Sequence, residues 1–273
     1  MSDIVLSAGV RSNLLQLQQT SDLISQTQNR LATGKKVNSA LDNAINFFTA
    51  QGLDTRANNL SGLLDAMSNG VSTIQAANNG ISAITKLVQA AQALVSQAQQ
   101  ANNTVTQAAL ATQFNTLLTQ IGQLAGDAGF NGVNLLANNA LTITLDDSGN
   151  SSIVVAGVSY TNAQASPLSI ANATNNWASA SDITTASTAL SAALTNLQSE
   201  SQTLSSSLST VQIREDFTKS MINTLKSGSD NLTLADTNEE GANLLALQTR
   251  QQLSSTALSL AAQADQNVLR LFR

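Results

Sequence analysis

Apolar residues recur at alternating spacings of three and four along most of this chain, and this spacing limits the possible folds more than any other feature. The clearest run consists of Leu190, Leu194, Leu197, Ser201, Leu204, Leu208, Val211, Glu215, Thr218, Ile222 and Leu225. Because an α-helix completes one turn in about 3.6 residues, the members of such a run lie along one helical face. Spacing of this kind that continues over many turns is typical of helices that pack side by side. The sequence therefore predicts long helices in lateral contact.

The same spacing appears in three earlier segments. Their members are Val10, Leu14, Leu17, Ser21, Ile24, Gln28 and Leu31; Leu60, Leu64, Met67, Val71, Ile74, Asn78, Ile81, Thr85, Val88, Gln92 and Val95; and Leu110, Phe114, Leu117, Ile121 and Leu124. The first helix is predicted to stop at Gly34, because glycine is favoured just after a helix C-terminus. The polar residues 227–231 are predicted to interrupt the run of residues 190–225. Since aromatic residues are 3% and charged residues 11% of the chain, helices packed through leucine and alanine are easier to build than a thick globular core.

The last helical segment carries two apolar stripes. One is Leu253, Ala257, Leu260, Ala264, Asn267 and Leu271, and the other is Leu244, Leu247, Gln251, Ser254, Leu258, Ala261, Asp265, Val268 and Phe272. A helix with one partner needs only one apolar seam. The extra stripe indicates either a wider core contact within one chain or burial against other subunits.

The middle of the chain changes its pattern. Apolar side chains alternate with threonine over residues 141–145, and a second apolar run begins at Ile153, after the turn-forming residues 146–150. This arrangement predicts a short β-hairpin. The residues that follow, through Pro167 to about Asp182, are predicted to be a loose polar stretch.

The composition excludes several kinds of chemistry. Without histidine or cysteine, the chain can form neither a serine–histidine catalytic pair nor a zinc site of the usual kind. The net charge is −5 and no basic run exceeds Lys35-Lys36, which argues against nucleic-acid binding. No apolar run is long enough for membrane insertion, and no cleaved signal peptide is recognisable. We therefore expect no enzyme activity, no cofactor and no metal, and we interpret Asp146-Asp147 as a solvated turn.

Three segments resemble the bacterial flagellin family. Residues 29–43 read NRLATGKKVNSALDN, residues 126–136 read GDAGFNGVNLL, and residues 248–273 end in NVLRLFR. These are similar to the family's N-terminal helix end, its Phe-Asn-Gly turn and its C-terminus. With the helices between them, the resemblance covers roughly residues 4–136 and 183–273.

The resemblance implies a mainly α fold: a long antiparallel helical bundle with paired N- and C-terminal helices and a small β-hairpin insertion. It implies that residues 1–33 and 235–273 form the inner filament core, that 34–136 and 183–234 form an outer helical layer, and that 137–182 form an exposed β insertion. The residues expected at the interface between subunits are Leu14, Leu17, Ile24, Leu31, Leu247, Leu258, Leu260, Val268, Leu271 and Phe272.

The resemblance also implies a function and a set of partners. The chain is expected to polymerise with itself into the extracellular flagellar filament that drives bacterial motility. Expected partners are flagellar junction and cap proteins, the flagellar type III export apparatus and an export chaperone, with export that needs no cleaved signal peptide. One alternative is a hook–filament junction protein, which shares the helical ends. Another is a secreted helical effector or translocator, which should carry a long apolar segment.

Overall fold

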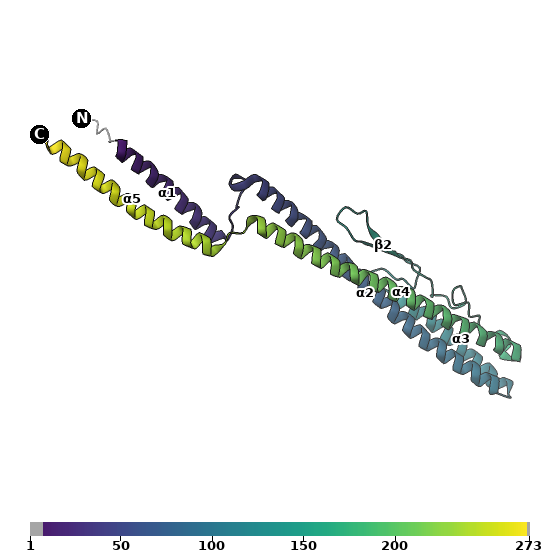
Figure 1. Cartoon of the computed structure of the whole chain (residues 1–273). Coiled ribbons are helices and arrows are strands. Elements are labelled where there is room, and N and C mark those ends of the chain that lie inside the picture. The colour runs from purple at the N-terminus through teal and green to yellow at the C-terminus, as the bar shows by residue number, and fades with distance from the viewer. Residues whose placement is uncertain (1–7, 272–273) are drawn as a thin grey trace. The chain divides into compact units, whose positions relative to one another are not determined.

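The computed structural model describes residues 8–271, apart from the side chains of residues 265 and 268–271. Five long helices and a two-stranded antiparallel sheet make up the described chain (Figure 1). The elements are α1 (Ala8–Thr33), α2 (Ala40–Gln100), α3 (Thr104–Asp127), β1 (Leu141–Thr144), β2 (Ser152–Val155), the 3₁₀ helix η1 (Thr174–Trp177), α4 (Ala180–Thr233) and α5 (Thr237–Leu271). The predicted fold class, mainly α with a small β-hairpin, is confirmed.

The chain divides into two compact units. The terminal unit contains the residues up to Thr55 and those from Thr224 onward, and the central unit contains Arg56–Asn223. The boundaries between the units therefore fall within α2 and α4.

In the terminal unit, α1 and α5 lie side by side (Figure 1). The two linkers next to them form a short antiparallel bridge, in which the amide of Lys36 donates to the carbonyl of Thr233 at 2.7 Å and that of Ala235 to the carbonyl of Gly34 at 3.0 Å. Gly34 has φ of 69°, a left-handed conformation that favours glycine and ends α1 where the sequence predicts. These contacts hold the end of α1 beside the start of α5.

Helix α2 contains a kink close to its start. Asn43 has non-helical dihedral angles, φ −163° and ψ 100°. Its side-chain oxygen accepts a hydrogen bond from the amide of Asn46 at 3.0 Å, which is the role of an N-cap. The regular part of α2 therefore begins just after Asn43.

In the central unit, α2, α3 and α4 share one hydrophobic core. Every member of the predicted stripes between Leu60 and Val95 is buried or half-buried. Polar contacts connect α2 to α4, from Asn78 to Ser201 and from Gln92 to Ser191, each at 3.4 Å. The predicted helix faces are thus the faces that pack.

The hairpin pairs Leu141 with Val155 and Thr144 with Ser152, as its alternating pattern predicts. One face of it belongs to the core, since Ile143 and Val155 are buried. The other face is open, and Val154 is 63% exposed.

The prediction of a loose polar stretch between the hairpin and α4 is wrong. Tyr160, Leu168, Ile170 and Trp177 are all buried there. The ring of Trp177 lies 4.9 Å from that of Phe114 on α3, measured between centroids. Single large side chains without a regular spacing anchor this segment, so no periodic pattern revealed it.

The predicted interruption at residues 227–231 is also wrong, because α4 continues to Thr233. A β-carbon added to Gly228 would lie 3.3 Å from a methyl group of Leu53. The glycine therefore fits a close approach between α2 and α4 within the terminal unit. Burial of Leu225 and Ser229 on either side offsets the cost of about 1 kcal/mol that glycine brings to a helix.

Candidate subunit interface

The two apolar stripes of α5 have different surroundings. Leu244, Leu247, Gln251, Ser254, Leu258 and Ala261 are all half-buried on the side of α1. The described members of the other stripe, Leu253, Ala257, Leu260, Ala264 and Asn267, are all exposed. Leu253 and Leu260 retain 67% and 62% of their accessible surface. One stripe of α5 therefore packs within the chain, and the second has no cover from the described residues.

The inward face of α1 differs slightly from the predicted stripe. Thr20 and Thr27 are buried, whereas Ser21 and Gln28, which the spacing favoured, are exposed. The hydroxyl of Thr20 donates to the carbonyl of Gln16 at 2.8 Å. Because this bond satisfies the hydroxyl, the threonine can turn its methyl group toward the partner helix. The recurrence of Thr20 and Thr27 seven residues apart is the signal that an apolar-only pattern missed.

Helix α1 also presents apolar side chains to solvent. Leu14, Leu15 and Leu23 are 40%, 58% and 45% exposed. Monomeric soluble proteins rarely leave many such side chains close together without a partner. The α1–α5 pair therefore has uncovered apolar surface on both of its helices.

The predicted interface residues fall into three groups. Ile24 is buried between the helices, and Leu17, Leu31, Leu247 and Leu258 are half-buried. Leu14 and Leu260 are exposed. The side chains of Val268, Leu271 and Phe272 lie outside the described part of the structure. Of the predicted interface residues that the structure describes, Leu14 and Leu260 are thus the exposed ones, at 40% and 62%.

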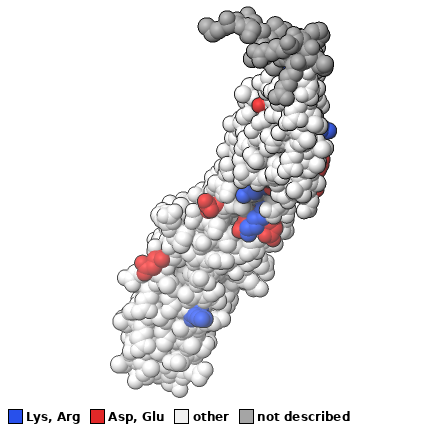
Figure 2. Space-filling model, turned by 90° about the vertical axis from the view of Figure 1, so that its left-hand side faces the viewer, with Lys and Arg blue, Asp and Glu red and all other residues white. Residues whose placement is uncertain are grey.

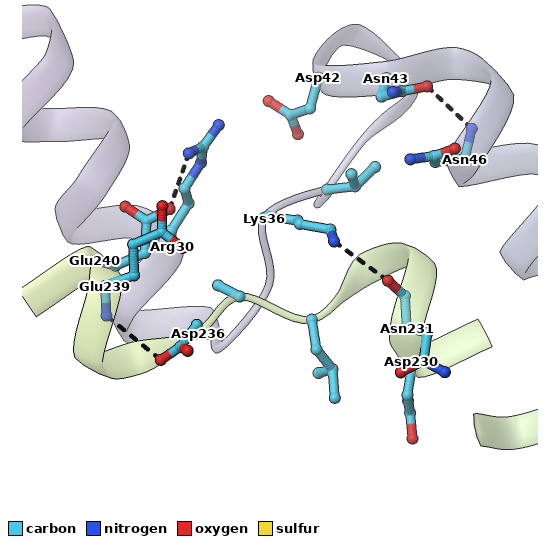
Figure 3. A pocket seen from close by; sticks show the side chains of 13 residues that line it. Arg30, Lys36, Asp42, Asn43, Asn46, Asp230, Asn231, Asp236, Glu239 and Glu240 are labelled. Carbon is cyan, nitrogen blue, oxygen red and sulfur yellow. Dashed lines mark hydrogen bonds and ion pairs between the residues drawn. The ribbon is translucent and has the colours of Figure 1, made fainter. Parts of the chain in front are cut away.

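An open pocket of about 600 Å³ adjoins the paired linkers (Figure 3). Arg30 of α1 reaches across it to Glu240 of α5, with 2.9 Å between Nη1 and Oε1. Lys36 donates to the carbonyl of Asn231 at 3.2 Å. The first contact joins the two terminal helices, and the second joins the linker after α1 to the end of α4.

Carboxylates in this pocket also cap helices. Asp236 accepts a hydrogen bond from the amide of Asn238 at 2.8 Å at the start of α5, where negative charge is favourable. Asp42 accepts from the amides of Asn38 and Ser39. These two bonds, that to Asn38 first, lower the pKa of Asp42. Asp42 and Asp236, like Glu240, thus have partners within the chain, and these three carboxylates help to hold the linkers and helix ends in place.

The Asp146-Asp147 pair is part of the hairpin turn. Asp146 accepts hydrogen bonds from the hydroxyl of Ser148 and from the amide of Ser151, and these bonds lower its pKa in that order. Asp147 lies 3.5 Å from the guanidinium of Arg56 on α2. Both carboxylates thus have partners that hold the turn, although the sequence alone predicted only solvation.

Charged side chains are sparse on the molecular face in Figure 2. Among the described residues, no three His, Cys, Asp or Glu side chains gather closely enough to hold a metal ion. No described helix combines the length and the apolar character needed to cross a membrane.

Long paired helices with an apolar stripe that no described residue covers define a helical protein with a surface suited to a further partner. The comparisons identify the family. The family model "Bacterial flagellin N-terminal helical region" matches residues 8–140, and "Bacterial flagellin C-terminal helical region" matches residues 187–272. The chain belongs to the bacterial flagellin family.

Full-length relatives agree with this assignment. Flagellin FljM of Caulobacter vibrioides is 30% identical over 100% of this chain and 99% of its own length. A flagellin of Brucella melitensis is 28% identical over the whole of both chains. The crystal structure of Bacillus cereus flagellin is similar to 55% of this chain and covers 86% of its own, at 18% identity and a TM-score of 0.46, so the assignment rests on the family models and the full-length relatives.

Family membership makes this chain a structural subunit that assembles with copies of itself into the flagellar filament. The comparisons do not favour a hook–filament junction protein or a secreted effector.

Proposed function

We propose that copies of this subunit assemble through the outward faces of α1 and α5, which form the inner core of the filament. The exposed stripe of α5 carries this proposal, because Leu253 and Leu260 remain open to solvent while the other stripe packs on α1. Burial of apolar surface contributes roughly 25 cal/mol per Å², so covering this stripe along several turns favours assembly. The exposed Leu14 and Leu15 of α1 would add to the same surface.

Family membership supports, as further proposals, a set of additional partners. They are the flagellar junction and cap proteins, an export chaperone and the flagellar type III apparatus, which would deliver the subunit outside the cell without removing a signal peptide. Mass spectrometry of filament protein tests the route: an intact N-terminus is expected, and loss of ten or more residues would contradict it. We also propose that the protein has no catalytic activity, in keeping with a structural family.

A truncation tests the assembly surface. A chain that ends at residue 234 lacks α5 but keeps the central unit and its hydrophobic core. It should therefore fold, as judged by circular dichroism and cooperative melting, and yet fail to form filaments under conditions in which the full chain does. Residues 8–33 and 237–264 should be cleaved by protease in the monomer and protected in the polymer. Normal filaments of the truncated chain would disprove the proposal.

A further inference from the structure

The first turns of the regular part of α2 expose a second apolar surface, separate from α1 and α5. Ile45 and Phe48 are 79% and 61% exposed. They lie three residues apart in the helix that follows the Asn43 cap, so they share one face. Leu41, just ahead of the kink, is 98% exposed. Three large apolar side chains thus lie uncovered within one short stretch.

Gly52 continues this face, one turn after Phe48, and is also exposed. Glycine in a helix interior weakens the helix relative to alanine, so it usually has a steric reason. At Gly70, Gly80 and Gly122 an added β-carbon would come within 2.3, 2.7 and 2.4 Å of other atoms of the chain. At Gly52 an added β-carbon would meet nothing within 4 Å. Gly62, farther along α2, is equally open, so open space alone does not indicate a partner. Gly52 differs from Gly62 because it continues the face of the exposed Ile45 and Phe48, where a closely approaching partner would explain it.

One acidic residue beside this face is opposite in charge to one basic residue of α5. Between residues 40 and 55 the charged residues are Asp42 and Asp54, both acidic. In α5, Arg250 is exposed and lies between the acidic Glu239-Glu240 pair and Asp265. Asp42 precedes the α2 face, and Arg250 precedes the exposed stripe of α5. Opposite charges would therefore meet at the same end if the two helices ran parallel.

We propose that the Ile45–Phe48–Gly52 face of one copy docks on the exposed α5 stripe of the next copy, with the helices parallel. The paired positions are Ile45 with Leu253, Phe48 with Ala257 and Gly52 with Leu260. In each face the first and last residues are seven positions apart, and at two of the three paired positions a large side chain meets a small one. This complementarity lets the helices approach closely.

The contact has the symmetry that a filament requires. An open helical polymer needs two different surfaces of the subunit to meet, because a contact between identical surfaces closes into a dimer. The α2 face and the α5 stripe are such a pair of different surfaces. The inference rests on the proposed function, since it assigns a partner to the α5 stripe.

Disulfide trapping tests the pairing directly, because the chain has no cysteine. Chains carrying Gly52→Cys and chains carrying Leu260→Cys are mixed, assembled and oxidised. Disulfide dimers are expected from the mixed filaments, and not from the mixed monomers or from filaments of either variant alone. A disulfide needs the two Cα atoms within about 7 Å. Dimers would therefore show that position 52 of one copy faces position 260 of another. Gly62→Cys is the matched control, because Gly62 is likewise exposed in α2 with open space around it, and it should give no dimers with Leu260→Cys.

The outcomes separate this inference from the proposed function. Mixed filaments that form without dimers would overturn the pairing and leave assembly through α5 standing. Dimers between Gly52→Cys and Leu15→Cys in their place would assign the α2 face to α1. Failure of the native chain to assemble at all would instead count against the proposed function.

A change of side-chain size gives a second test without cross-linking. Gly52→Leu fits the free monomer, because the site is open, and should leave its melting temperature unchanged or higher. It should abolish sedimentable filaments, whereas Gly62→Leu should not. Adding Leu260→Ala to Gly52→Leu should restore assembly by exchanging large for small. Native filament yield from Gly52→Leu alone would contradict the inference.

Discussion

Trp177 illustrates how a single side chain can anchor a segment that has no periodic pattern. It is fully buried against Phe114, and its indole nitrogen has no hydrogen-bond partner among the described residues. Trp177→Ala should lower the free energy of unfolding by about 3–5 kcal/mol, because it leaves a large cavity. Trp177→Phe should cost clearly less, since it keeps an aromatic ring and removes a donor that makes no bond. Chemical denaturation measures both. Equal losses for the two variants would mean that the cavity is not the dominant effect.

Asp42 gives the chain a local dependence on pH. Its carboxylate accepts the amide bonds of Asn38 and Ser39, which lower its folded-state pKa below that of the unfolded chain. The stabilising contribution is therefore present above the unfolded pKa of about 3.9 and is lost as the pH falls through the folded value. Asp42→Ala should melt at a lower temperature than the native chain at pH 7. The difference should shrink as the pH is lowered below about 4, and a constant difference would contradict this assignment.

At the scale of the helix, the packed face of α4 can be tested by substituting two of its leucines that differ in burial. Leu204 is buried and Leu208 is half-buried. Leu204→Asp should destabilise the central unit by about 3 kcal/mol or more, because it buries a charge without a partner. Leu208→Asp should cost less, since that carboxylate can reach solvent. Ser152→Ala, on the exposed edge of β2, should be nearly silent. Thermal unfolding ranks the three variants, and an equal melting temperature for all would refute the seam.

The helices also show which features of the fold could be predicted from the sequence. The helices and their packing faces follow from local spacing, so the seam of α4 and the separation of the two α5 stripes could be read from residue order. The supposed break at Gly228 could not be read correctly, because its tolerance depends on Leu53, which is distant in the sequence. Thr20 joined the inward face of α1 through a hydrogen bond to its own helix, which an apolar pattern ignores.

The candidate interface likewise has parts that the sequence predicts and parts that it does not. The α5 stripe was visible in the sequence because a stripe with no partner is still periodic. The α2 face at Ile45 and Phe48 cannot be recognised from the sequence, because its significance depends on exposure, and exposure is a property of the folded chain. Likewise, the pairing of Arg30 with Glu240 joins residues from opposite ends of the chain. Contacts between residues so distant in the sequence cannot be predicted from local patterns and become visible only in the folded structure.

At the scale of the whole molecule, the two units should differ in local stability. The central unit contains almost the entire buried core, whereas the described buried apolar side chains of the terminal unit are few and include Val10, Ile24 and Val37. Regions with few buried apolar contacts open at a lower free-energy cost. In the monomer, the amide hydrogens of α1 and α5 should therefore exchange with solvent faster than those of α3.

Assembly should reverse this difference, and that reversal is the sharpest test of the whole arrangement. If neighbouring copies cover the exposed stripe of α5, opening α5 in a filament means exposing that stripe as well, so exchange there should slow markedly. The amides of α3, which the subunit's own core already protects, should change little. Hydrogen–deuterium exchange with mass spectrometry can compare monomer and filament for both helices in one experiment. Slowing in α3 without slowing in α5 would place the main contact between copies in the central unit and would contradict assembly through the terminal helices.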